Sequence, residues 1–396
     1  MLRHMMKLIW KRKTRNLMLT LEILLAFVLL FALAAFALRS AQLYRLPLGF
    51  VYQDVWSVAI SSDSEEPGHT GFEAFKRDLL AMPEIEGVAL AGFGPFSDST
   101  MTNRFEGEGG VQHAANMLVV SDDYASVSGI ALVAGRWFGP ADGGTDVTPV
   151  VINRHFAEEL FPGKSALGQL FTDSDYGDKH PNMLKVTGVI DDYRGRSDFM
   201  APGNYMITRE KPEPGAGIYG TLVLKLRAGT PRYFEARLQE RLRQVDNTMH
   251  YDIAPQAELR SAILRQELTP LAGMAVVAAF MLLMVGFGLF GVLWQNTTRR
   301  IPELGLRRAV GATAGQIYLQ IIGEQALLST VAIAAAMLLL VQLPLAGAFA
   351  NALNAQVFIG AAVLSAGLIY LVSLLCALYP GWHASRLSPS AALHDE

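Results

Sequence analysis

Hydrophobic and polar positions follow two different patterns along this chain. Long stretches almost free of charge cover residues 17–38, 271–294 and 325–383, whereas the residues between 40 and 268 mix short apolar runs with many charges. At ~1.5 Å per residue, each of the first two stretches can cross a bilayer once, and the third can cross it twice. The pattern predicts transmembrane helices over residues 17–39, 269–294, 325–346 and 357–380, with a turn at 344–356.

Residues 40–268 have the pattern of a folded domain inserted between the first and second apolar helices. Short apolar runs predict strands at 51–60, 87–91, 116–120, 149–152, 184–190 and 221–226. Helical spacing predicts helices at 71–82, 122–128, 154–161 and 231–245. Because long irregular stretches interrupt the strand and helix sequence, the domain is expected to be α+β rather than a doubly wound nucleotide-binding fold. The expected fold class is an α-helical membrane protein with four transmembrane helices plus an α+β extracytoplasmic domain.

The end of this domain is expected to connect directly to the membrane. Residues 257–270 have helical spacing and lead without a break into the apolar run 271–294. A continuous helix would mechanically link the domain to the second span, and Pro270 is expected to kink it near the membrane.

The segment 295–324, between the second and third apolar runs, is rich in arginine. Arg299, Arg300, Arg307 and Arg308 lie within ten residues, which places the segment in the cytoplasm by the positive-inside rule. Pro302 is suited to the first turn of a helix, and Glu303 complements its positive end. The apolar spacing is interrupted around Gly311 and Gly315. The segment is therefore interpreted as a short helix along the membrane surface followed by a bend; a basic loop that only fixes orientation is the alternative.

Both ends of the chain are expected on the same side as this segment. Residues 1–16 form a basic amphipathic segment suited to an anionic membrane surface, and the tail 381–396 carries Arg386. A cleavable signal peptide has a similar plan, but the apolar run is long for one. Glu22 is either an intramembrane functional acid or a side chain that reaches the inner interface and a basic neighbour, and its position favours the second.

Charge and motifs narrow the possible functions. Residues 41–269 hold 21 Lys and Arg against 31 Asp and Glu, a net charge of −10, while the rest holds 12 against 5, a net charge of +7. This division argues against nucleic-acid binding. The single cysteine, Cys376, excludes a disulfide or a thiolate metal site in residues 41–269. Asp-rich spots at 122–123, 173–178 and 191–192 are expected to be solvated loops rather than calcium sites, and the histidines show no ligand spacing.

Sequence signals for catalysis and for ion-coupled transport are missing. There is no GxxxxGK[ST], HExxH or G-x-S-x-G motif, so a membrane-anchored enzyme is the weakest hypothesis. The apolar runs carry Glu22 and Glu324 near their inner ends and little else that ionises, whereas ion-coupled transporters need polar groups near the midplane. The chain is therefore expected to be driven by an external motor, and its glycine- and alanine-rich faces suit packing in a dimer.

Two stretches near the end of the chain have distinctive motifs. The first is R-x-x-E-L-G-L-R-R-A-V-G-A at residues 300–312, followed by an apolar helix with Glu324. The second is the end Y-P-G-W-H-A-S-R-L-S-P-S-A-A-L at 379–393. Both stretches resemble the FtsX-like/MacB-like ABC transporter permeases, the type VII mechanotransmission family. The runs AGRWF (134–138), VVIN (150–153), LFPGK (160–164), LG (167–168) and VTGVI (186–190) are similar to the family's periplasmic core domain.

The resemblance implies a permease in the bacterial inner membrane with both termini in the cytoplasm. Two permease chains pair, identical or different, and each docks on a cytoplasmic ABC ATPase through a coupling helix. No cofactor is expected in this chain, since ATP would bind the ATPase. The positions that match the ATPase-facing region are Arg300, Glu303, Gly305, Arg307, Arg308, Ala309, Gly311 and Ala312.

Two functions remain open under this resemblance. The first is export of drugs, peptides or other periplasmic substrates, in some systems with a periplasmic adaptor protein. The second is a regulatory module of the FtsX type that controls a cell-wall hydrolase or a sensor without moving substrate. Pro302 departs from the family pattern and is expected to shift where the coupling helix starts.

Overall fold

The computed structural model describes residues 13–62, 70–107, 110–143, 147–174, 182–210, 218, 220–345 and 354–386. The chain divides into two compact units: an α+β unit, Leu43–Gln266, and an apolar helical unit made of the segments before Leu43 and after Gln266. The expected amphipathic segment 1–16 and the tail 381–396 fall mostly outside the described residues.

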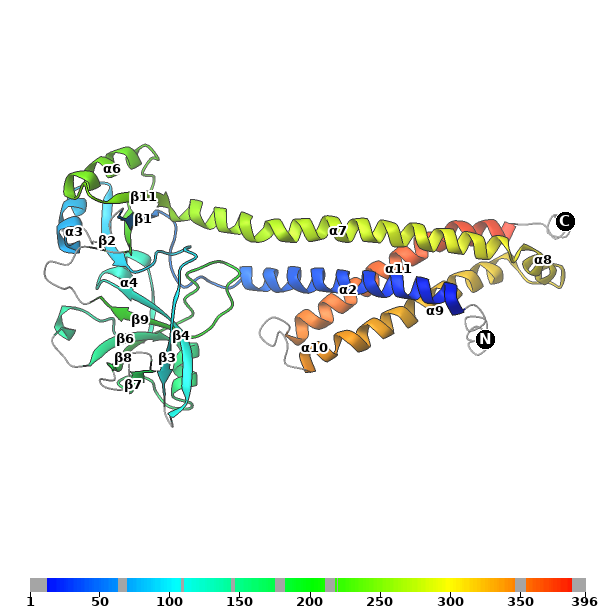
Figure 1. Ribbon diagram of the computed structural model, residues 1–396, viewed down its shortest axis with the longest axis horizontal. Coiled ribbons are helices and arrows are strands. Elements are labelled where there is room, and N and C mark those ends of the chain that lie inside the picture. Colours follow the sequence, from blue (N-terminus) through cyan, green and yellow to red (C-terminus); the bar gives the residue numbers. More distant parts are fainter. Residues whose placement is uncertain are drawn as a thin grey trace. The chain divides into compact units, whose positions relative to one another are not determined.

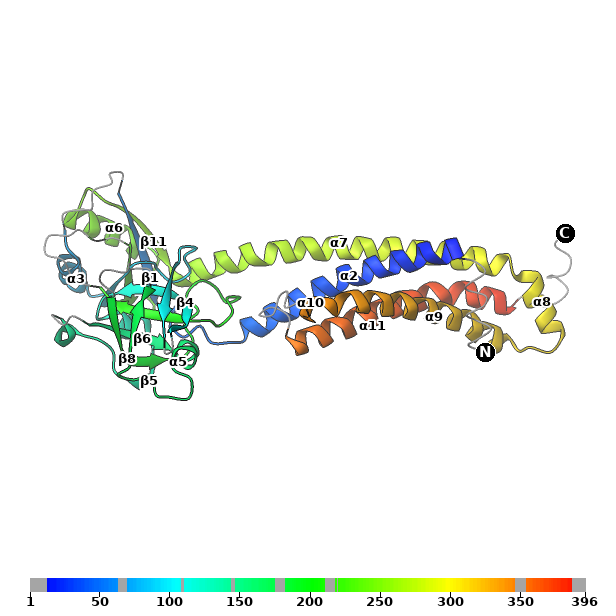
Figure 2. The same ribbon diagram turned by 60° about the horizontal axis from the view of Figure 1, so that its bottom comes forward.

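Long apolar helices build the helical unit (Figure 1). They are α2 (Lys13–Tyr44), α7 (Gln256–Thr298), α9 (Ala314–Leu340) and α11 (Ala355–Arg386). In the described chain, four helical segments are long and apolar enough to span a membrane: Leu17–Tyr44, Gln256–Gln295, Ala314–Leu340 and Ala355–His383. One apolar core includes side chains of all four, among them Phe27, Val285, Ala332 and Ala361. Helices α9 and α11 lie side by side (Figure 2). Together with the inserted α+β unit, these helices confirm the expected fold class.

The helix boundaries differ from the predicted ones for local reasons. Helix α9 begins at Ala314, inside the segment 295–324, because Thr313 caps it. The Thr313 side chain accepts from the Gln316 amide at 3.3 Å, and the Gln316 side chain accepts from the Thr313 amide at 3.0 Å. Helix α7 runs through Pro270 as one element. The predicted turn at 344–356 includes the end of the short helix α10 (Gln342–Leu345) and residues outside the described chain.

Glu22 faces a neighbouring helix. A Cβ atom built on Gly288 of α7 would lie 2.8 Å from both carboxylate oxygens of Glu22. A larger residue at 288 would therefore displace this carboxylate. The side chain of Arg15, its expected basic neighbour, lies outside the described residues.

The described part of the α+β unit forms an eleven-stranded sheet. The strand order is β11-β1-β10-β2-β4-β3-β7-β8-β6-β9, with β5 beside β8 and a further pairing of β4 with β9. The strands are β1 (Val55–Ser61), β2 (Ile85–Ala91), β3 (Met101–Glu106), β4 (Gln112–Val120), β5 (Leu132–Gly135), β6 (Thr148–Asn153), β7 (Leu170–Asp173), β8 (Asn182–Ile190), β9 (Tyr205–Arg209), β10 (Gly220–Leu226) and β11 (His250–Pro255). Most pairs are antiparallel, and β4–β9 and β6–β8 are parallel.

Helices cover the sheet in two places. Helices α3 (Phe72–Leu80) and α6 (Phe234–Val245) lie on the strands β11, β1, β10 and β2 (Figure 1) and bury Phe75 and Leu238 against Leu222. Helix α5 (Arg154–Leu160) buries Phe156 beside Phe105 of β3. The mixture of antiparallel strands and helices is α+β, as expected.

Five strands were not predicted, namely β3, β5, β7, β9 and β11. Strand β3 has the polar sequence MTNRFE, and β5 and β7 have four residues each, so none has an extended apolar run. Strand β11 ends where α7 begins, and β9 has five residues. Strands β5, β9 and β11 pair with strands distant in sequence, whereas β3 and β7 pair with the next strand along the chain and with each other. This pairing, rather than their own pattern, fixes all five strands.

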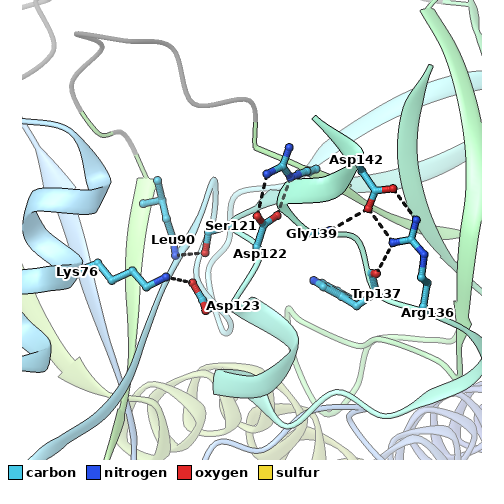
Figure 3. Close-up of polar contacts among 10 residues, drawn as sticks. Lys76, Leu90, Ser121, Asp122, Asp123, Arg136, Trp137, Gly139 and Asp142 are labelled. Atoms are coloured by element: carbon cyan, nitrogen blue, oxygen red, sulfur yellow. Dashed lines mark hydrogen bonds and ion pairs between the residues drawn. The ribbon is translucent and has the colours of Figure 1, made fainter. Parts of the chain in front are cut away.

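The Asp-rich turn at 122–123 is fixed by ion pairs (Figure 3). Asp122 accepts from Arg209 of β9 at 2.6 and 2.8 Å, and Asp123 pairs with Lys76 of α3. The preceding hydroxyl, that of Ser121, accepts from the Leu90 amide at 2.9 Å. Three consecutive side chains thus join the turn to three other elements, which differs from the expected solvated loop.

Candidate functional site

The arginine-rich segment folds as a short helix between two long ones. Helix α7 ends at Thr298, and α8 covers Ile301–Ala309, with Pro302 in its first turn. The chain then bends at Gly311, whose φ is +105°. This backbone conformation strongly favours glycine because any side chain would be strained there. Helix α9 starts three residues later, so α8 folds back along it.

An apolar contact attaches α8 to α9. Leu304 is buried against Ile317 and Ile321, which lie one turn apart on α9. Burying a leucine side chain in this way contributes about 2 kcal/mol.

A closed ring of polar side chains accompanies this contact. Arg300 donates to Glu324 at 2.7 Å and to Glu303 at 3.2 Å. Arg307 donates to Glu303 at 2.9 Å and to Gln320 at 2.7 Å. Gln320 completes the ring by donating to Glu324 at 2.9 Å. We call these five side chains the coupling ring. Arg300 lies directly before α8, Glu303 and Arg307 lie on α8, and the other two lie on α9, so the ring fixes the orientation of α8 on α9.

Arg300 is the buried member of the coupling ring. The residue is 9% exposed, and its Nη2 atom has no hydrogen-bond partner among the described residues. Burial lowers the pKa of Arg300, but Glu324 and Glu303 more than offset this, so the pKa is raised overall. The guanidinium therefore stays charged at a buried position in the segment that connects α7 to the first turn of α9. We call this segment, residues 299–315, the elbow.

The predicted coupling residues take different positions. Glu303 and Arg307 are partly exposed and pair with each other one turn apart. Ala309 and Gly311 are exposed, and the Ala312 amide donates to the Arg307 carbonyl at 3.0 Å. The side chain of Arg308 and the surroundings of Gly305 lie outside what the structure describes.

The outer face of α8 is apolar, a feature that the sequence analysis did not single out. Leu306 is 59% exposed and Val310, directly after the helix, is 83% exposed. Pro302 and Ala309 are also exposed. Because residues 302, 306, 309 and 310 follow helical spacing, they share one face opposite Leu304. We call Pro302, Leu306, Ala309 and Val310 the docking face.

Aromatic rings gather where α7 and α11 end. Trp294 and Tyr379 stack with ring centroids 5.7 Å apart, and His383 lies 5.3 Å from Trp294. Phe290 and Trp382 extend the group. Tryptophan and tyrosine concentrate at the level of lipid headgroups, so this end of the helices has the composition of a membrane interface.

The described residues contain no group of three or more His, Cys, Asp or Glu side chains that could hold a metal ion. Two of the dispersed histidines do meet one carboxylate: His113 lies 3.2 Å and His155 3.7 Å from different oxygens of Glu159. Hydrogen bonds from Asn204 and His113 lower the pKa of Glu159 despite partial burial. The carboxylate thus joins β4 to α5.

Two protein-family descriptions match the chain. "FtsX-like permease C-terminal" matches residues 275–389, and "MacB-like periplasmic core domain" matches residues 18–241. The first match contains the whole of α8 and all five side chains of the coupling ring. The second contains most of the α+β unit.

Curated relatives agree with these families. Macrolide export ATP-binding/permease protein MacB 1/2 of Paracoccus denitrificans is 26% identical over 227 residues, covering 56% of this chain and 33% of the relative. A MacB of Bdellovibrio bacteriovorus is 23% identical, covering 70% of this chain and 43% of the relative. Uncharacterized ABC transporter permease YknZ of Bacillus subtilis is 23% identical, covering 65% of this chain and 62% of the relative. The chain thus spans less than two thirds of the length of these relatives.

Two solved structures similar to the chain are of extramembrane regions. The periplasmic region of MacB from Actinobacillus actinomycetemcomitans aligns with a TM-score of 0.40 and 14% identity, covering 54% of this chain and 94% of that structure. The extracellular domain of YknZ aligns with a TM-score of 0.35 and 14% identity, covering 50% of this chain and 99% of that structure.

Proposed function

Because the chain belongs to the FtsX-like/MacB-like family of ABC transporter permeases, we propose that it couples ATP hydrolysis by an ABC ATPase subunit to movement of its α+β unit. Helix α8 is the coupling helix in this proposal. The helices α2, α7, α9 and α11 cross the inner membrane, and the α+β unit lies in the periplasm. The export of drugs, peptides or other periplasmic substrates is the output we favour.

The observation that supports this proposal most is the two-sided construction of α8. One side is held on α9 by Leu304 and the coupling ring, while the docking face leaves Leu306 and Val310 exposed. Exposed apolar side chains on a rigid support are typical of protein interfaces, in which a few such anchors supply most of the binding energy. An ATPase that binds this face would transmit its movement to α9 through the coupling ring.

The charge of the elbow supports its placement in the cytoplasm. Arg299, Arg300, Arg307 and Arg308 lie in the short connection between two apolar helices, and such connections carry their arginines on the cytoplasmic side. With four spans, both termini are then cytoplasmic and the α+β unit is outside.

A second copy of the chain, or a related permease, would pair along α7. Gly273, Val277, Phe280, Met284, Phe287 and Gly291 are exposed and alternate at spacings of four and three residues. This is the heptad pattern of a helix seam, and we call it the α7 seam. Cβ atoms built on Gly273 and Gly291 would meet nothing within 4 Å, so both positions leave room for close approach.

A regulatory module of the FtsX type is the second candidate function. Polar side chains inside the helical unit bind each other, which fits this candidate and the export function equally. Ser329 and Ser373 share a hydrogen bond of 2.8 Å, as do Thr330 and Tyr370. Such paired hydroxyls strengthen helix packing and favour a bundle that transmits movement, which either candidate needs.

Purification of the chain with its ATPase tests the proposal. We expect a complex with two permease chains, whose ATP hydrolysis is lost when the docking face is disrupted. A chain that purifies without any nucleotide-hydrolysing partner from its native membrane would contradict it. A periplasmic adaptor in the same complex would favour export, and a cell-wall hydrolase or sensor would favour signalling.

A further inference from the structure

The loop 194–200 of the α+β unit binds the end of α2. Arg194, which is 1% exposed, donates to the carbonyl oxygens of Leu43 at 3.0 Å and Leu46 at 2.8 Å. Leu43 belongs to the last turn of α2, whose carbonyl groups lack partners within the helix. Arg194 also donates to the carbonyls of Met200 at 2.8 Å and of Asp198. One guanidinium thus joins the helix end to both sides of the loop.

The same loop binds the beginning of α7. The Asp198 side chain is 4% exposed and accepts from Arg260 Nε at 2.9 Å and Nη2 at 2.7 Å. Arg260 lies in the second turn of α7. Its Nη1 atom donates to the Tyr52 hydroxyl at 2.7 Å, and the guanidinium lies over the rings of Tyr52 and Tyr44. Asp198 therefore binds Arg194 through its carbonyl and Arg260 through its carboxylate.

These contacts join two helices that are far apart in sequence. Helices α2 and α7 are the elements through which the α+β unit continues into the apolar segments. The main-chain connections alone would attach α7 to the sheet more firmly than α2. Helix α7 follows directly on β11, and Gln256 is fully buried with its side chain bound to Ser57 at 3.2 Å. Helix α2 reaches the sheet through residues 45–54, which form no helix or strand.

We infer that Arg194, Asp198 and Arg260 form a clamp that makes the end of α2 and the start of α7 move together with the α+β unit. The inference rests on the proposed function, since it names the residues through which movement of the helices would reach the domain. All three are positioning residues. The Asp198–Arg260 pair is bidentate and has one buried partner, so it is directional, unlike an exposed ion pair, and can resist rotation of α7.

The test uses the full chain in complex with its ATPase, with Cys376→Ala as background. Nitroxide labels at Tyr233→Cys, directly before α6, and at Leu364→Cys of α11 report the distance between the α+β unit and the apolar helices. The native side chains are 76% and 51% exposed. Labelled chains are diluted with unlabelled ones, and distances are measured with and without ATP and vanadate. The clamp variants are Asp198→Asn and Arg260→Lys. The matched control is Glu258→Gln. Glu258 lies on α7 two residues from Arg260, and its substitution breaks an exposed pair with Arg232.

We expect an ATP-dependent change of the distance in the parent and in Glu258→Gln, and at least a twofold smaller change in both clamp variants. ATP hydrolysis should stay within twofold of the parent, because α8 is unchanged. A change of parental size in Asp198→Asn and Arg260→Lys would overturn the clamp and leave the proposed function intact. Absence of any change in the parent would overturn both.

Amide hydrogen exchange on the same complexes separates a clamp from a general stabilising role. The clamp predicts at least tenfold faster exchange in residues 43–48 and 257–263 of the Asp198→Asn variant, with exchange in β10 unchanged. Equal acceleration in β10 would show that the substitution destabilises the whole unit, and would overturn the assignment of these residues to transmission.

Discussion

The Arg300 guanidinium donates to the Glu324 carboxylate at 2.7 Å, across the bend that separates α8 from α9. The two residues are 24 positions apart, and each also binds another member of the coupling ring. Arg300 is nearly buried, whereas the docking face on the other side of α8 is exposed. The pair therefore fixes the orientation of α8, but it is not part of the docking face.

Removing the Glu324 charge should loosen α8. In Glu324→Gln, the buried Arg300 loses a carboxylate, and we expect a cost of about 2–3 kcal/mol because the remaining charge is poorly solvated. Amide hydrogen exchange in α8 should then accelerate at least tenfold. Glu303→Gln is the matched control: Glu303 is 43% exposed, so the cost should be about 1 kcal/mol or less. Equal effects of the two substitutions would contradict the special role of Arg300–Glu324.

The two glycines of the elbow should respond oppositely to alanine. A Cβ atom at either Gly311 or Gly315 would meet nothing within 4 Å, but only Gly311 has a left-handed φ, +105°. Gly311→Ala should cost about 1–2 kcal/mol through backbone strain. Gly315→Ala, in the first turn of α9, should be neutral or stabilise by up to about 1 kcal/mol. Thermal unfolding of the purified chain compares them, and a harmless Gly311→Ala would contradict the bend described here.

The α7 seam predicts which cysteines cross-link between two chains. In a Cys376→Ala background, Met284→Cys should form an intermolecular disulfide under mild oxidation in membranes. Leu283→Cys is the control because it is more exposed, 59% against 43%, but points about 100° away on the helix. Stronger cross-linking at 283 than at 284 would place the dimer contact on another face.

The Arg136–Asp142 pair, seen in Figure 3, gives the α+β unit a pH-dependent contribution to stability. Hydrogen bonding from Arg136, at 2.5 and 2.7 Å, lowers the pKa of Asp142 from 3.8 to about 2. Because the folded-state pKa is depressed, this stabilisation is present above pH 3.8 and is lost as the pH falls through about 2.

Asp142→Asn should therefore lower the free energy of unfolding by about 0.5–1 kcal/mol at pH 7, discounted for the exposure of Arg136, and by nothing near pH 2. Calorimetry of the full chain at several pH values measures the difference. Asp191→Asn, which removes the exposed pair with Arg154, is the control and should have less effect at pH 7. A deficit of Asp142→Asn that persists undiminished at pH 2 would contradict the pairing.

Much of this architecture follows from patterns within the sequence. The four apolar helices are visible as uncharged runs, and the position of α8 follows from Pro302, Glu303 and the bend. The spacing of its leucines also allows the two faces of α8 to be distinguished from the sequence. Leu304 and Leu306 are two residues apart, so a helix turns them to nearly opposite sides, and only one can pack on α9.

Other parts depend on contacts that no local pattern contains. Gln320 is one of several polar residues at the start of α9, and its place in the coupling ring exists only because α8 folds back along α9. Arg194 binds backbone carbonyl groups 147 and more positions away, and carbonyl groups have no sequence signature. Asp122 and Arg209, which form a bidentate pair 87 positions apart, become neighbours through the parallel pairing of β4 with β9.

Substitutions in the docking face test whether an ATPase moves this permease through α8. Leu306→Asp and Val310→Asp should leave the chain folded, because both native side chains are exposed, 59% and 83%. If each contributes about 1.4 kcal/mol to binding, the double variant should bind the ATPase about 100-fold more weakly. Tyr233→Asp, at a 76% exposed site directly before α6, is the control and should bind like the parent.

The decisive measurement is the affinity of the purified chain for its ATPase, determined by titration in lipid nanodiscs for the parent, the double variant and the control. We expect a loss of affinity of about two orders of magnitude confined to Leu306→Asp/Val310→Asp, together with loss of permease-dependent ATP hydrolysis. Parental affinity and hydrolysis in that double variant would contradict it.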